Sequence, residues 1–159
     1  MAFRVQFSYS GFGPAEKAIG ALTYFSSSGL MAQVGLNMER MIKRRIRSEK
    51  TSPDGRRWEP NKDGTSILFR TGGLYGSIKH RTTPFRAIVG TNWYPAHVHQ
   101  FGMIITARRG YMVYKSGGQW HRSRRVRIPQ RMFMGLSAAN LAELRQVINA
   151  HMSRWLPWR

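Results

Sequence analysis

The amino-acid sequence predicts an α+β fold: a small antiparallel sheet packed with two main amphipathic helices, plus a projecting basic β-hairpin. Two segments, residues 27–50 and 137–155, place apolar residues at helical spacing. Shorter stretches alternate polar and apolar residues with the period of two that is typical of strands. The stretch between Asp63 and Glu143 contains no acidic residue and is rich in arginine.

Length and composition predict one domain over residues 1–159, with an N-terminal segment at 1–30 and an extended hairpin arm at 103–128. A hydrophobic share of 42% and an aromatic share of 12% are typical of a chain with a packed core. The absence of cysteine excludes disulfides and thiolate metal sites. No apolar run approaches the ~20 residues that a membrane-spanning helix needs.

Charge is the most unusual property of the sequence. Twenty-six Lys and Arg residues against seven Asp and Glu residues give a net charge of +19. A surface of this kind repels itself unless an acidic molecule lies opposite. Nucleic acid, an anionic membrane and acidic protein partners are the candidate molecules.

The N-terminal half begins with an edge strand predicted at residues 4–9 and a short helix predicted at 15–25. A longer helix is predicted from a cap at Ser27 or Ser28 to about Lys50. Its apolar side consists of Met31, Val34, Met38, Met41, Ile42 and Ile46. Four basic residues near its end are interpreted as a solvated face that complements the helix dipole: Lys43, Arg44, Arg45 and Arg47.

The middle of the chain combines turn signals with two short strands. Residues 52–55, Ser-Pro-Asp-Gly, are a strong turn signal. Alternating residues predict strands at 77–82 and 85–91. One or two helical turns are then predicted over residues 94–102, closed by Gly102.

A long hairpin is predicted over residues 103–127, with its turn at 116–118. Because isolated buried charge is costly, neither face of the hairpin is expected to be buried near the tip. The hairpin is therefore expected to project and to pack on a molecule outside the monomer. The return strand, 120–128, carries arginines on both faces: Arg122 and Arg124 on one, Arg125 and Arg127 on the other.

The last predicted element is a helix capped by Ser137 that runs to Trp155. Its apolar residues are spaced to form one stripe, which is typical of a helix that packs on a sheet or another helix. The stripe consists of Leu141, Leu144, Val147, Ile148, Met152 and Trp155.

The residues give little support for an enzyme, and no cofactor is expected. His97 and His99 are the close pair of candidate metal ligands; on a strand they would share a face, and on a short helix they would diverge. A zinc site needs a third ligand, and no cysteine or nearby carboxylate supplies one. Ordinary hydrogen bonds at a bend are the favoured interpretation, and a metal-dependent enzyme is the weakest alternative.

Sequence-independent nucleic-acid binding is a stronger alternative. Tyr111, Tyr114 and Trp120 are interleaved with basic residues, the mixture expected of base stacking and phosphate contact. The same hairpin would equally suit an acidic neighbouring subunit. The basic residues expected to face a partner or DNA are Arg108, Arg109, Lys115, Arg122, Arg124, Arg125 and Arg127.

Several motifs, weak alone, follow one another in a specific order. Their residues are Pro53, Asp54, Gly55, Trp58, Gly72, Leu74, Tyr94, His99, Gln100, Phe101, Gly102, Pro129, Arg131 and Phe133. From about Met31 to Trp155 the chain resembles the phage virion morphogenesis family, the tail-completion proteins of Mu-like and P2-like tailed phages. It departs from the family pattern at Pro95, an inserted proline, and at Met132, where the family has proline.

The resemblance implies a structural virion protein that completes the tail and joins it to the head or neck. It further implies an oligomeric ring, expected to be a hexamer as in related head–tail joining proteins, with other neck or tail proteins as partners. The chain is then expected in the virion after assembly in the host cytoplasm, with no membrane contact. The basic hairpin is interpreted chiefly as a docking arm, with contact to genomic DNA as a second role.

Overall fold

The computed structural model describes residues 26–155 and confirms the α+β fold class. The elements are α2 (Ser27–Arg44), a π-helical turn η1 (Arg45–Glu49), α3 (Gly73–Ser77), β1 (Ile78–Thr83), β2 (Arg86–Thr91), α4 (Ala96–Phe101), β3 (Met103–Thr106), β4 (Met112–Ser116), β5 (Gln119–Ser123), β6 (Arg125–Ile128) and α5 (Ala138–Met152). The strand predicted at residues 4–9 and the helix predicted at 15–25 lie outside the described residues.

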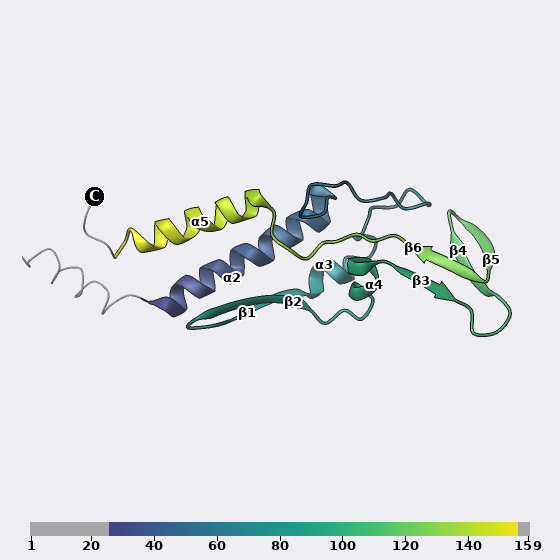
Figure 1. Ribbon diagram of the computed structural model, residues 1–159, viewed down its shortest axis with the longest axis horizontal. Coiled ribbons are helices and arrows are strands. Elements are labelled where there is room, and N and C mark those ends of the chain that lie inside the picture. Colours follow the sequence, from purple (N-terminus) through teal and green to yellow (C-terminus); the bar gives the residue numbers. More distant parts are fainter. Residues whose placement is uncertain (1–25, 156–159) are drawn as a thin grey trace, which may run out of the picture.

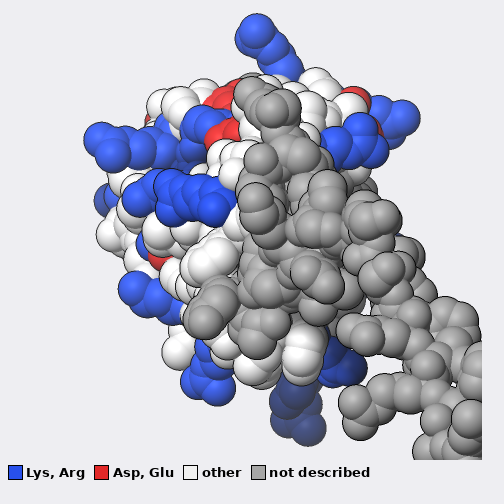
Figure 2. All heavy atoms as spheres, turned by 90° about the vertical axis from the view of Figure 1, so that its left-hand side faces the viewer, with Lys and Arg blue, Asp and Glu red and all other residues white. Residues whose placement is uncertain are grey.

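The molecule is elongated. Helices α2 and α5 and the β1–β2 hairpin form one end, and strands β3 to β6 form the other (Figure 1). A view onto the helical end shows Lys and Arg side chains projecting around its edge and few acidic side chains (Figure 2). Positive charge is therefore not confined to the strand-rich end.

The strands form three separate antiparallel pairs, β1–β2, β3–β6 and β4–β5, where the sequence predicted one small sheet. The return strand predicted over residues 120–128 is divided at Arg124. Ser123 Oγ accepts a hydrogen bond from Arg125 N at 3.2 Å and donates one to Arg125 O at 2.6 Å. Because this local bonding competes with strand pairing, β5 and β6 pair with different strands.

The longer helix, predicted to end at about Lys50, is confirmed as α2 followed directly by η1. Its N-cap is Ser26, one residue before the predicted cap; Ser26 Oγ accepts a hydrogen bond from Gly29 N at 3.0 Å. Met41, Ile42 and Ile46 of the predicted apolar side are buried. This side of the helix lies against the β1–β2 hairpin and α5 (Figure 1).

Glu39 links α2 to the first strand pair. Its Oε2 accepts a hydrogen bond from His80 N at 3.0 Å and lies 2.6 Å from His80 Nδ1. Burial raises the pKa of Glu39, but hydrogen bonds from Lys43 and His80 outweigh it and lower the pKa to about 2. Gly35 lies beside this contact, where a Cβ would be 2.9 Å from the His80 and Thr82 side chains. The hairpin therefore packs close to the helix backbone.

The interpretation of the four basic residues as a solvated face is wrong for Arg45, whose side chain is 1% exposed. Arg45 lies four residues after Met41 and directly before Ile46, both buried. Helical spacing therefore turns it toward the interior. Burial lowers the pKa of the Arg45 guanidinium, while the carboxylate of Glu49 acts in the opposite direction.

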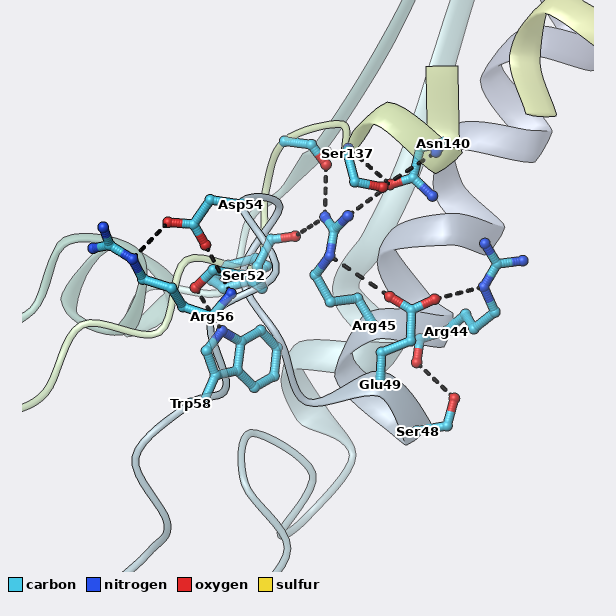
Figure 3. Close-up of polar contacts among 12 residues, drawn as sticks. Arg44, Arg45, Ser48, Glu49, Ser52, Asp54, Arg56, Trp58, Ser137 and Asn140 are labelled. Atoms are coloured by element: carbon cyan, nitrogen blue, oxygen red, sulfur yellow. Dashed lines mark hydrogen bonds and ion pairs between the residues drawn. The ribbon is translucent and has the colours of Figure 1, made fainter. Parts of the chain in front are cut away.

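The Arg45 guanidinium joins the end of the first long helix to the segment that precedes α5 (Figure 3). Its Nη1 donates to the carbonyl oxygens of Phe133 at 3.0 Å and Gly135 at 2.6 Å. Its Nη2 donates to Asn140 Oδ1 at 2.6 Å, and its Nε lies 3.9 Å from Glu49 Oε2. These acceptors offset the cost of removing the charge from water.

The terminal helix begins as predicted, at Ser137. Ser137 and Asn140 form a capping box: Asn140 N donates to Ser137 Oγ at 3.2 Å, and Ser137 N donates to Asn140 Oδ1 at 3.1 Å. Asn140 Oδ1 thus accepts from both Ser137 and Arg45. The cap and the buried arginine together set how the helix is rotated about its axis.

The predicted apolar stripe of α5 is only partly correct. Asn140, Leu144 and His151 are the buried residues of the helix. Leu141 and Ile148, which were expected in the stripe, are 46% and 37% exposed. Because Asn140 is held inward by Arg45, the face that it shares with Leu144 and His151 packs against the body, and part of the apolar face is left in solvent.

The hydrophobic core lies in the middle of the molecule. It joins the end of α2, η1, α3, the start of β1 and of α4, and the segments around residues 58 and 133. Its buried members are Ile42, Ile46, Trp58, Leu74, Ile78, Ala96 and Phe133. The core is thus assembled from short pieces that are distant in sequence.

Replacing Arg45 by methionine tests whether the guanidinium organises these pieces. The Arg45→Met variant leaves the carbonyls of Phe133 and Gly135 without a donor, so we expect the free energy of unfolding to fall by about 3 kcal/mol. Urea unfolding followed by circular dichroism measures this. The exposed Arg47→Met is the matched control, with an expected change within ~0.5 kcal/mol. Equal stability of the two variants would contradict this role for Arg45.

Candidate interaction site

Most of the family-motif residues lie where the strand-rich end joins the rest of the molecule. We call residues 103–128 the arm and the other described residues the body. Trp58, Leu74 and Phe133 are buried in the core of the body. Gly72 directly precedes α3, and Pro129 directly follows the arm. The motifs therefore build the body and the base of the arm.

The predicted turn at residues 52–55 is present. Gly55 N donates to Ser52 O at 2.9 Å, and Asp54 Oδ1 accepts from Arg56 N at 3.1 Å. Ser52 Oγ accepts from Trp58 Nε1 at 3.1 Å (Figure 3). The turn therefore positions the buried indole that follows it.

Two glycines allow close approach at the two ends of the segment between the arm and α5. A Cβ on Gly135 would lie 2.8 Å from Pro53 Cγ. A Cβ on Gly102 would lie 3.0 Å from Gln130 N, and Gly102 has a φ of 71°, which favours glycine. Gly102 ends α4 as predicted.

Gln100 holds the segment that follows the arm. Its Oε1 accepts hydrogen bonds from Phe133 N at 3.1 Å and Met134 N at 3.0 Å. Its Nε2 donates to Met134 O at 3.4 Å. The side chain therefore replaces the partners that these backbone groups would find in a strand.

Arg131 performs a similar task on the other side of this segment. Its backbone N donates to His99 O at 2.7 Å. Its Nε donates to Glu59 O at 3.0 Å and its Nη2 to Pro60 O at 3.4 Å. Burial lowers the pKa of this guanidinium, with Glu59 acting in the opposite direction. Arg131 is therefore a positioning residue rather than a free cation.

His97 and His99 both lie on helix α4, the arrangement in which the two side chains diverge, and each has its own neighbours. His97 Nδ1 lies 2.7 Å from Tyr94 O. The His99 ring stacks on Trp93, with centroids 6.1 Å apart and planes at 7°. Within residues 26–155, no three His, Asp or Glu side chains are grouped to hold a metal.

Two motif residues point outward. Tyr94 is 85% exposed and Phe101 is 71% exposed. Phe101 shares a cavity with Tyr94 on one side and a second cavity with Met103 and Ile104 on the other. We call Tyr94, Phe101, Met103 and Ile104 the neck patch. Adjoining exposed apolar side chains of this kind are typical of interaction surfaces.

The arm has no core of its own. No residue from 97 to 130 is buried, although this stretch includes several large apolar side chains. Each of its strand pairs has two strands only, β3–β6 and β4–β5. Isolated two-stranded hairpins are marginally stable in water, so packing on a further molecule would stabilise the arm.

The β4–β5 hairpin has two different faces. One face includes Tyr114, Ser116 and His121; Tyr114 and Ser116 line a cleft of about 390 Å³ together with residues 59–63 of the body. The side chains of the opposite face point to the other side of the hairpin, because successive residues of a strand alternate, although Lys115 also borders the cleft. We call this the outer face. It consists of Val113, Lys115, Trp120 and Arg122 of the two strands, together with Tyr111 and Arg124 directly beyond them, whose side chains contact each other.

The predicted basic residues of the arm are all exposed, and the structure divides them into groups. Arg108 and Arg109 lie in the β3–β4 connection, and Arg125 and Arg127 lie on β6. Arg127 Nη1 is 3.9 Å from Glu59 Oε2. The other basic residues, Lys115, Arg122 and Arg124, belong to the outer face.

Among residues 26–155, no helix has the length and apolar character needed to cross a membrane.

Sequence reasoning missed Arg45 and Asn140, which hold the segment before α5. A signal was present: Met41, Ile42, Arg45 and Ile46 follow the spacing of one helical face. The positive charge of Arg45 favoured a solvent-facing interpretation, although its position lies on the apolar face of the helix.

Protonation of His99 provides a test of the base of the arm. Burial, and then the charge of Arg131, lower its pKa below the ordinary value of 6.5. Folding therefore favours the neutral ring, and stability is lost as the pH falls below about 6.5. The His99→Phe variant keeps a flat ring beside Trp93. Between about pH 7.5 and about pH 5.5, we expect its melting temperature to fall less than that of the wild type. The exposed His97→Phe should keep the wild-type dependence; the same dependence in all three proteins would refute this assignment.

Comparison with known proteins agrees with the motifs. The family model described as the phage virion morphogenesis family matches residues 18–153. No curated protein and no solved structure matches the chain. The family match covers nearly all of the body and the whole arm, so the resemblance seen in the motifs is confirmed. The chain belongs to the phage virion morphogenesis family.

Proposed function

We propose that this chain is a structural virion protein that completes the phage tail and joins it to the head or neck, as a subunit of an oligomeric ring. The exposed arm is the observation that carries this proposal, because its apolar residues find no core within the monomer. Family membership supports a structural role in the virion rather than a catalytic one. Resemblance to head–tail joining proteins favours six copies in the ring.

The neck patch supports contact between copies of the chain. A ring forms when a patch on one subunit contacts a different surface on the next. Tyr94 and Phe101 are large, exposed aromatic side chains at the base of the arm, and such residues are enriched at protein interfaces. The arm would then extend from the ring toward other neck or tail proteins.

Removing the neck patch should weaken self-association without unfolding the chain. We expect the double variant Tyr94→Ser with Phe101→Ser to shift the purified protein toward monomer, since it removes two exposed apolar anchors. Sedimentation velocity measures the distribution of species. Phe85→Ser with Ile88→Ser, which changes two exposed residues on the β1–β2 hairpin, is the control and should keep the wild-type distribution. An unchanged distribution in the Tyr94 and Phe101 variant would remove the patch from the interface.

A phage that lacks the gene for this chain tests the proposed role directly. We expect electron microscopy to show heads and tails that accumulate unjoined, and a supplied wild-type gene to restore joined particles. The arm variant with Arg122, Arg124, Arg125 and Arg127 replaced by Ser should remain folded and fail to restore them. Normal joining by this variant would refute the arm's role. Absence of the chain from the mass spectrum of mature particles would refute the virion location.

A further inference from the structure

We propose that the outer face of the β4–β5 hairpin binds the backbone of duplex DNA without regard to sequence. This inference rests on the proposed function only for bringing the chain to a place where DNA passes. The binding itself is a property of the purified protein.

Two arginines of the outer face lie close together against one aromatic ring. The guanidinium groups of Arg122 and Arg124 lie 4.2 Å and 5.3 Å from the centroid of the Tyr111 ring. Both positive groups are therefore within about one Debye length of each other, ~10 Å at 0.1 M salt. Contact with the ring restricts the two side chains and leaves their N–H groups available for an anion. This arrangement concentrates positive charge rather than spreading it.

A second copy of the chain is poorly suited to neutralise this charge. Every acidic residue of the described region already lies within 4.0 Å of a basic side chain of its own chain: Glu39, Glu49, Asp54, Glu59, Asp63 and Glu143. Acidic side chains at the helical end are accordingly seen beside basic ones (Figure 2). Each copy carries a net charge of +19, so a second copy would bring further positive charge to this face. The ligand of the outer face is therefore a different, strongly acidic molecule.

DNA suits this face better than an acidic protein does. Interfaces with DNA are far more positively charged than interfaces between proteins, and the outer face gathers three cations and no acidic residue. On the outer face, Arg122 pairs with Val113 in the middle of the hairpin and Lys115 pairs with Trp120 near its turn. Arg124 directly follows β5, and Arg108 and Arg109 lie in the β3–β4 connection. A two-stranded ribbon also has dimensions that the major groove of B-DNA admits. Contacts made by these long cations to phosphates carry no sequence information.

The test uses the purified full chain and a fluorescein-labelled duplex of random sequence, measured by anisotropy at several salt concentrations between about 50 and about 200 mM. We expect affinity at the lowest salt that falls steeply as salt increases. The variant Arg122→Gln with Arg124→Gln should lower the slope of log affinity against log salt by about 2, since two phosphate contacts are lost. The control, Arg81→Gln with Arg86→Gln, removes two exposed charges from the β1–β2 hairpin and should change the slope by less than half as much.

Two further probes separate the alternatives. Poly-glutamate is added as a competitor of the bound duplex. Binding of a labelled single strand is measured separately, with the wild type and with the Arg122 and Arg124 variant. If poly-glutamate competes as well as unlabelled duplex, the face binds acidic protein and the proposal is wrong. If the single strand binds through Arg122 and Arg124 more tightly than the duplex does, the duplex assignment is wrong. Absence of duplex binding at low salt, or equal slopes for the two double variants, overturns the proposal as well. Because these outcomes concern only the purified chain, each leaves the joining role to be decided by the phage experiment.

Discussion

The buried guanidinium of Arg45 is the interaction on which the rest of the structure depends. It lies where α2 passes into a π-helical turn, and it binds the backbone on the far side of the core through Phe133 and Gly135. Through Asn140 it also sets which face of α5 turns inward. A buried cation is costly unless acceptors surround it, and the acceptors of Nη1 and Nη2 come from the segment between the arm and α5 and from Asn140. This contact therefore selects one arrangement of that segment.

That segment is held again by two side chains from the base of the arm. Gln100 pairs with the backbone of Phe133 and Met134, and Arg131 donates to Glu59 and Pro60. The contacts are mainly from side chains to backbone, because the segment has no strand partner. The result is a body whose centre is determined by polar contacts around a small core, with the arm attached to a well-held base.

The arm differs from the body because it has neither a core nor a network of buried polar contacts. Its strands pair only two by two, and its apolar and basic side chains remain in solvent. The neck patch is apolar and aromatic, whereas the outer face of β4–β5 combines aromatic rings with cations. Surfaces of such different chemistry suit different partners, which is why we propose self-association for the first and DNA binding for the second.

Local sequence determined several features by itself. The long helices, the turn at residues 52–55, the two strands that became β1 and β2, and the end of α4 at Gly102 follow from periodicity, capping and turn residues, which act between neighbours. The ordered motifs likewise identified the family. Tertiary structure alone decided that Arg45 is buried, that Leu141 and Ile148 of α5 face solvent, and that the return strand divides at Arg124. The first two depend on contacts between residues about 90 positions apart in the chain, and the third on which strands find a partner. Periodicity records that a helix has an apolar side, but only the contact of Asn140 with Arg45 decides which side of α5 is buried.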